Sequence, residues 1–284
     1  MRYSLVVNLY CGLPKRLNMF HPCRLAALAL VVVSFSACKV ESLDDPIIVP
    51  VVDQEFAFDL WQNLASTSMS PLEVRMYTLE DYECLNTSIL TNYLRVGRNL
   101  ELTLFDILDP EVCDAGLGPA TGVEVLDNIE EDLYRLKIEL QDVVQNDGWL
   151  TVTADSYTVE MEQENGISWQ HYEMRRIPEE AFWGYITYPD AASQLQAETF
   201  LSDLQQLGTV ADLQDGYYGH YSLSDNGTKV DVNTTSLPGQ AITFLFEYTG
   251  ENAEIDQRVE AFLMDADPEL QLHFWNGKGD EWRR

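Results

Sequence analysis

The sequence predicts an α+β protein, in which an antiparallel β-sandwich over residues 55–178 precedes a smaller α+β domain over residues 179–284. The first region contains short stretches of alternating apolar residues, and the second places two helical stretches between strands. A chain of 284 residues fits two domains of roughly 100–200 residues each. Its composition, 46% hydrophobic and 23% charged, is that of a globular protein.

Period-two alternation predicts the strands of the first region, because it buries one face of a strand. It occurs at Leu72, Val74 and Met76, at Leu100, Leu102 and Leu104, at Leu136, Ile138 and Leu140, and at Tyr157, Val159 and Met161. The Asn-Gly pair at 165–166 is typical of a tight hairpin. The pattern resembles an immunoglobulin-like sandwich in architecture only, since no tryptophan lies between Cys84 and Cys113.

The second region has the element order β-α-β-β-α-β, which is the ferredoxin-like plan. Apolar residues at helical spacing predict one helix after Asp190 and another that ends before Pro268. Each helix has one apolar stripe, so both can cover one face of a four-stranded sheet. The strands are expected at 182–188, 217–223, 242–248 and 270–274, with an extra short strand at 229–232. The alternative is one continuous mixed fold.

The charge of the chain excludes several classes of partner. It holds 17 Lys and Arg against 47 Asp and Glu, for a net charge of −30. Residues 1–37 contain four cations and no anion, so the remainder carries −34, which is −30 minus 4. A field of this sign repels phosphate, and we therefore expect no nucleic-acid partner and no electrostatic attachment to anionic membrane surfaces.

The start of the chain contains an apolar stretch of eleven residues, 25–35, directly after Arg24. It is too short for a membrane span of about 20 residues and fits the core of a secretory signal peptide. It ends in the sequence Phe35-Ser36-Ala37-Cys38, which resembles the lipobox of bacterial lipoproteins. That resemblance implies a signal peptide over residues 1–37, cleavage before Cys38, and acylation of its sulfur and its new N-terminus. The alternative is an ordinary signal peptide with a chance cysteine.

Residues 38–54 are expected to form a tether between the acylated cysteine and the folded region. The acidic stretch at 39–45 resembles the export signal of surface-displayed lipoproteins in Bacteroidota-type bacteria, and the alternative is a solvated linker. The prolines at 46 and 50 stiffen the next stretch. Several acyl chains anchor a protein stably, so the resemblance implies an outer-membrane lipoprotein facing the periplasm or the cell surface. Either Met1 or Met19 can be the start, and Met19 gives a signal peptide of normal length.

Two cysteines, Cys84 and Cys113, remain in the folded region. Disulfides persist outside the cytoplasm, so the simplest prediction is that these two residues pair. A closed loop of about 30 residues would contribute roughly 3 kcal/mol. The alternative is two buried free thiols. A zinc site is not expected, because no histidine lies near them in the sequence.

Chemical motifs are scarce, and we predict no catalytic residue, no cofactor and no metal site. No HExxH, GxSxG, Walker or GxGxxG motif occurs. His220, which lies among tyrosines, is a weak candidate for a general base or a metal ligand. Close acidic pairs such as 162/164 and 265/267, and the acidic run 130–132, are candidates for acid–base or calcium sites. Among 47 carboxylates such groups also arise by chance on a solvated face.

Aromatic residues give the stronger functional signal. Trp149 follows Gly148 and Trp169 follows the 165–166 turn, and aromatics at the loop tips of a sandwich can stack on sugar rings or anchor a partner. Both can equally be core residues. The sequence therefore predicts a non-enzymatic, lipid-anchored envelope protein that tethers a partner protein or glycan at the outer membrane. The alternatives are a carboxylate-dependent hydrolase on the cell surface, with or without calcium, and a structural subunit of an envelope complex.

Overall fold

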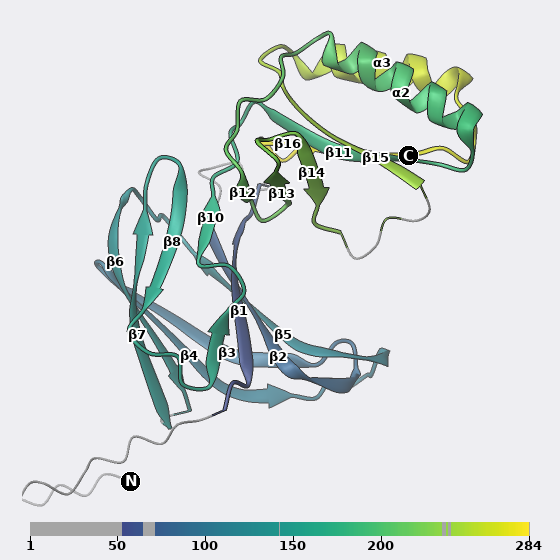
Figure 1. The fold of residues 1–284 in the computed structure, drawn as a ribbon. Helices are drawn as coiled ribbons and strands as arrows, with labels where there is room; N and C mark the ends of the chain where they lie inside the picture. The colour runs from purple at the N-terminus through teal and green to yellow at the C-terminus, as the bar shows by residue number, and fades with distance from the viewer. Residues whose placement is uncertain (1–52, 65–71, 142, 235–236, 238–239, 284) are drawn as a thin grey trace, which may run out of the picture. The chain divides into compact units, whose positions relative to one another are not determined.

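The computed structural model describes residues 53–64, 72–141, 143–234, 237 and 240–283, which belong to one compact unit, Pro50–Arg284. The predicted signal peptide, Cys38 and nearly all of the tether lie outside the described residues. Strands dominate the described part, and its two helices fall in the C-terminal half, as predicted (Figure 1). Neither helix is long and apolar enough to cross a lipid bilayer.

Residues 56–175 build one ten-stranded sheet that curls around its own core (Figure 1). Its sheet order is β10-β8-β7-β6-β4-β3-β5-β2-β1-β9. The strands are β1 (Phe56–Gln62), β2 (Leu72–Cys84), β3 (Ser88–Val96), β4 (Asn99–Leu108), β5 (Ala115–Leu126), β6 (Asp132–Leu140), β7 (Val144–Val152), β8 (Ser156–Met161), β9 (Ile167–Trp169) and β10 (Glu173–Arg175). The parallel pairing of β4 with β6 joins the strands on either side of it into this single hydrogen-bonded sheet.

The predicted alternation forms the core face of this sheet. Met76 and Ile138 are fully buried, and nearly all the other residues of the four predicted alternating stretches pack in the same cluster. Met161 is partly buried against it. Burying aliphatic side chains of this size contributes roughly 1.5–3 kcal/mol each before the cost of chain entropy. The core of the first region was therefore correctly predicted from period-two alternation.

The C-terminal half contains a four-stranded and a three-stranded sheet, with orders β15-β11-β16-β17 and β12-β13-β14. Figure 1 shows α2 and α3 side by side over the same sheet. Phe200 of α2 and Ile255 of α3 pack into one core with Phe244 and Phe274 of the four-stranded sheet. The elements are β11 (Ala181–Tyr188), α2 (Ala191–Gln205), β12 (Gly216–Tyr217), β13 (Tyr221–Ser224), β14 (Lys229–Val232), β15 (Gln240–Glu247), α3 (Asn252–Asp265), β16 (Gln271–Asn276) and β17 (Glu281–Arg283).

The four-stranded sheet follows part of the predicted plan. A ferredoxin-like sheet places its first strand between the third and the fourth, and β11 lies between β15 and β16 in this way. The strand expected beside β15 is instead part of the three-stranded sheet. Tyr221 and Leu223 of β13 pack in one buried cluster with Trp183 of β11, and this packing explains why residues 216–232 leave the edge of β15.

Two local predictions are confirmed. Asp190 caps α2, because its Oδ1 accepts hydrogen bonds from the backbone N–H groups of Ala192 and Ser193 at 3.0 and 2.8 Å. Cys84 and Cys113 form a disulfide, which ties the end of β2 to the segment before β5. The two long strands that meet at this staple also carry the surface described next.

Candidate functional site

The ten-stranded sheet has a second face, opposite its core, which we call the outer face. The pairing of the strands determines which residues share this face. Asp59 of β1 pairs with Arg75 of β2, and Arg75 pairs with Val123 of β5, so all three lie on the outer face. The β1–β2 part is covered by side chains such as His171, Tyr217 and His220, and we call it the covered half. The β5–β3 part exposes its side chains and is the open half.

Asp59 is the centre of the covered half and is only 5% exposed. The Tyr217 hydroxyl donates to its Oδ2 at 2.6 Å, and the backbone N–H of Leu60 donates to its Oδ1 at 3.0 Å. Nδ1 of His171 lies 3.2 Å from both carboxylate oxygens. The His171 ring also stacks on the Tyr217 ring, with a centroid distance of 3.5 Å. A buried carboxylate is thus surrounded by donors, as its burial requires.

Burial dominates the electrostatics of this group. Desolvation raises the pKa of Asp59, and the Tyr217 hydrogen bond and His171 oppose that rise. Burial, together with the neighbouring Asp59, raises the pKa of Tyr217, so its hydroxyl remains a donor at all physiological pH values. An aspartate that orients an imidazole can serve a general base. Among the described residues, however, the His171 ring is hydrogen-bonded to Asp59 alone, so the pair has no nucleophile to activate.

His220 extends the covered half along β1. Its Nε2 donates to the backbone carbonyl of Gln62 at 2.8 Å, and its ring lies 4.1 Å from that of Trp61. The guanidinium of Arg75 lies 3.8 Å from the Trp61 ring centroid and also donates to Glu73. Desolvation lowers the pKa of His220 to about 4, so its imidazole is neutral at pH 7. The geometry of His220 is that of a buried packing residue.

The open half carries five aliphatic residues with 37–60% of their surface exposed, which we call the apolar patch. They are Leu90, Leu94 and Val96 of β3 and Val123 and Val125 of β5. Ser88 pairs in parallel with Thr121, which places Leu90 beside Val123. A solvent-facing sheet surface is normally polar, and a group of exposed aliphatic side chains on it, here interrupted by Asn92 of β3, marks a candidate interaction site.

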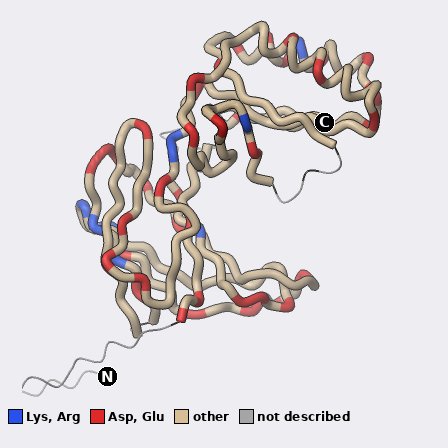
Figure 2. Tube along the Cα trace, viewed as in Figure 1, with Lys and Arg blue, Asp and Glu red and all other residues tan. Residues whose placement is uncertain are grey.

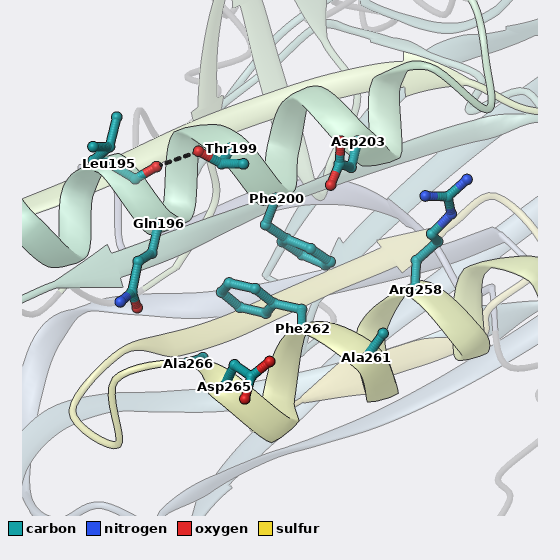
Figure 3. Close-up of a pocket in the computed structure, with 10 residues that line it drawn as sticks. All are labelled: Leu195, Gln196, Thr199, Phe200, Asp203, Arg258, Ala261, Phe262, Asp265 and Ala266. Atoms are coloured by element: carbon teal, nitrogen blue, oxygen red, sulfur yellow. Dashed lines mark hydrogen bonds between the residues drawn. The ribbon is translucent and has the colours of Figure 1, made fainter.

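A groove between α2 and α3 is a second candidate (Figure 3). Its volume is about 510 Å³, and the rings of Phe200 and Phe262 stack in it at a centroid distance of 4.1 Å. Asp203, Arg258 and Asp265 also line it. Figure 3 shows the Thr199 hydroxyl bonded to the Leu195 carbonyl of its own helix, whereas no dashed line joins Asp203, Arg258 or Asp265 to another residue drawn.

The two predicted stacking residues lie in different environments. Trp169 is 5% exposed and packs on Phe58 in the core, so its ring has no exposed face for a ligand. Trp149 is 37% exposed, but it lies within β7, opposite Arg135 and Glu160, and not at a loop tip. The structure does not bring the two rings into one surface. Their position after turn residues indicated a loop, whereas both belong to strands.

The predicted acidic groups are spread over separate elements. Figure 2 shows acidic positions along both halves of the chain. Residues 162 and 164 lie between β8 and β9, and Glu164 accepts a hydrogen bond from Tyr172. Residues 265 and 267 lie at the end of α3, and Asp267 accepts from Ser193. In each pair, one of the two carboxylates is thus engaged by a neighbouring side chain.

Comparison of the chain with protein-family models, with curated proteins and with solved structures finds no match. In the described part of the chain, no group of three or more His, Cys, Asp or Glu side chains is placed to hold a metal ion. Function is therefore inferred from the outer face, whose two halves differ in both polarity and exposure.

Proposed function

We propose that this protein is a lipid-anchored envelope protein that binds a partner protein through the apolar patch. The observation that supports this is the exposure of five aliphatic side chains on two adjacent strands of one sheet face. Covering each half-exposed aliphatic side chain would contribute roughly 1 kcal/mol to association. The disulfide ties the end of β2 to the segment before β5, so it supports one of the two strands that carry the patch.

The chemistry of the patch favours a protein over a glycan. Sugar-binding sites combine aromatic rings with hydrogen-bonding groups, whereas the patch consists of Leu and Val. An apolar surface on a partner would match it directly. The net charge of −30 favours a partner with basic groups around that surface, because such groups increase the association rate and orient the encounter.

The anchor in this proposal is the acylated sulfur of Cys38, at the junction of the signal peptide at 1–37 and the tether at 38–54. It is supported by the lipobox resemblance of residues 35–38. Cells that express the protein are labelled with a fatty-acid probe. The wild-type chain should incorporate the label and the Cys38→Ala variant should not. Equal labelling of both would contradict the anchor.

The finer fold assignments also belong to this proposal. We assign the curled ten-stranded sheet to an immunoglobulin-like sandwich architecture, and residues 179–284 to a ferredoxin-like plan. The position of β11 between β15 and β16, with both helices over one face, supports the second assignment. An experimental structure whose strand order departs from this arrangement would contradict it.

The docking surface is tested by the size of the complex that the protein forms in its membrane. Envelope membranes are solubilised in mild detergent, and the native mass is compared for the wild-type chain and the variant Leu94→Lys/Val123→Lys. The matched control is Leu133→Lys/Val143→Lys, which places the same two charges at exposed aliphatic residues outside the patch. We expect the patch variant to lose the large complex and the control to keep it. A patch variant that keeps the complex would contradict the proposal.

A further inference from the structure

Among the described residues, no strand pairs along the outer edge of β15, which is the end strand of the four-stranded sheet. It pairs with β11 along its whole length, from Gln240 opposite Tyr188 to Glu247 opposite Ala181. On its other side the described residues provide a single bridge, between Thr209 and Glu247 at one end. The strand that the ferredoxin-like plan would place here belongs to the three-stranded sheet.

The backbone direction of β15 identifies the groups on this edge. Glu247 exchanges both of its backbone hydrogen bonds with Thr209, so its N–H and C=O point away from β11. Groups two residues apart on a strand point the same way, and therefore Leu245, Thr243 and Ala241 also direct theirs outward. Within the described residues these three backbones have no hydrogen-bond partner on that side. Only the Thr243 side chain is engaged, with its hydroxyl donating to the carbonyl of Val230.

This edge also lacks the usual protection against strand pairing. Natural edge strands are kept short, charged, interrupted by proline, or covered. β15 has eight residues, and its stretch at 240–246, QAITFLF, contains neither a charge nor a proline. β14 contacts β15 through the side chains of Thr243 and Leu245 and leaves the outward backbone groups unpaired, and an uncharged edge of this kind can receive another strand.

We propose that the occupant is β15 of a second copy of this chain, paired antiparallel about a two-fold axis at Thr243. In this register Thr243 faces Thr243 of the second copy, and Ala241 faces Leu245. The outward N–H and C=O groups of these three residues then bond to one another across the two copies. This is possible because a two-fold axis places each N–H opposite a C=O of the other copy. Each chain has a net charge of −30, but residues 240–246 carry no charge. Two copies can therefore approach each other at this stretch without local repulsion.

The pairing has a defined salt dependence and does not use the apolar patch. Two copies repel each other over the rest of their surfaces, so higher ionic strength should strengthen the dimer. The patch lies on β3 and β5 of the ten-stranded sheet, and the edge lies on the four-stranded sheet. Substitutions in the patch should therefore leave the dimer unchanged, which separates the failure of one proposal from that of the other.

The test is cysteine cross-linking of the full chain in the membranes of cells that express it. Directly opposed residues in a hydrogen-bonded antiparallel pair have Cα atoms about 5.5 Å apart, a separation that a disulfide can span. Under mild oxidation, we expect Thr243→Cys to give a covalent dimer of twice the chain mass. The wild-type chain, treated in the same way, reports any contribution of the cysteines already present.

Two further variants test the register. Ala241→Cys alone should not cross-link to itself, because the two-fold axis places its copies four residues apart along the strands. A mixture of Ala241→Cys chains with Leu245→Cys chains should cross-link between the two. Three results would overturn the proposal: no dimer with Thr243→Cys, equal dimer from Ala241→Cys alone, or an adduct of Thr243→Cys with a different protein.

Discussion

The two halves of the outer face reverse the usual distribution of polarity. The covered half holds a buried carboxylate, a buried glutamate paired with a partly buried arginine, and a partly buried imidazole, and the open half exposes leucine and valine. The polar groups are buried because residues up to 158 positions away in sequence supply their hydrogen bonds. Within the described chain no such partner covers the aliphatic residues. The comparison shows that one half is completed by the chain itself, whereas the other half has the properties of a surface completed by a partner.

The largest expected effect concerns the disulfide, which links β2 of the covered half to the segment before β5 of the open half. Replacing both cysteines, Cys84→Ala with Cys113→Ala, should lower the free energy of unfolding by about 3 kcal/mol, because the bridge closes a loop with a sequence separation of 29. Urea unfolding followed by tryptophan fluorescence measures it. A loss below about 1 kcal/mol would mean that the strands are held mainly by other contacts.

The next prediction concerns the burial of the His220 imidazole in the covered half and its effect on stability at low pH. Its folded pKa of about 4 lies below the unfolded value of 6.5, so the unfolded chain takes up a proton that the folded chain does not. This group therefore removes up to about 3 kcal/mol of stability as the pH falls from 7 to 4. We expect His220→Gln to flatten the dependence of unfolding free energy on pH in this window. An unchanged slope would show that the imidazole is accessible to protons.

Asp59 tests the hydrogen bonds of the covered half. Asp59→Ala should lower the free energy of unfolding by about 2 kcal/mol, because the buried Tyr217 hydroxyl loses its acceptor. Asp59→Asn keeps an oxygen that can accept that bond and should cost less. Thermal unfolding of the two variants, with Tyr217→Phe as the matched control, gives the ranking. Equal losses for Ala and Asn would contradict the role assigned to the hydrogen bond.

The smallest effect on stability is expected in the open half. Leu94 is half exposed, and Leu94→Lys should change the free energy of unfolding by no more than about 0.5 kcal/mol. Chemical denaturation of the purified variant measures it. A loss of 2 kcal/mol or more would show that Leu94 packs within the protein, and the contrast between the two halves would then fail.

Local patterns predicted much of the core, the caps and the disulfide. Leu72, Val74 and Met76 alternate with polar residues, and that period alone identifies a buried face. The short pattern Asp190 followed by a helical stretch likewise predicted a cap that the structure confirms.

The covered half could not be predicted, because its contacts are non-local. Asp59 stands out in the stretch FAFDLWQ as the only charge in an apolar strand, but its partners His171 and Tyr217 follow 112 and 158 residues later. The apolar patch was missed for a different reason. In β3 apolar residues occur on both faces, so alternation does not show which face is the core. The continuity of the ten-stranded sheet depends on the pairing of β4 with β6, which no local pattern encodes.

The most direct measurement is hydroxyl-radical footprinting of the protein in intact cells and in its purified form. Oxidation of Leu94 and Val123 is compared with that of Leu133 and Trp149, which are exposed elsewhere on the same sheet. We expect Leu94 and Val123 to be protected from oxidation in cells and to become reactive after purification. Leu133 and Trp149 should be oxidised in cells and in the purified protein alike. Equal reactivity of Leu94 and Val123 in cells and in the purified protein would contradict a partner on the open half.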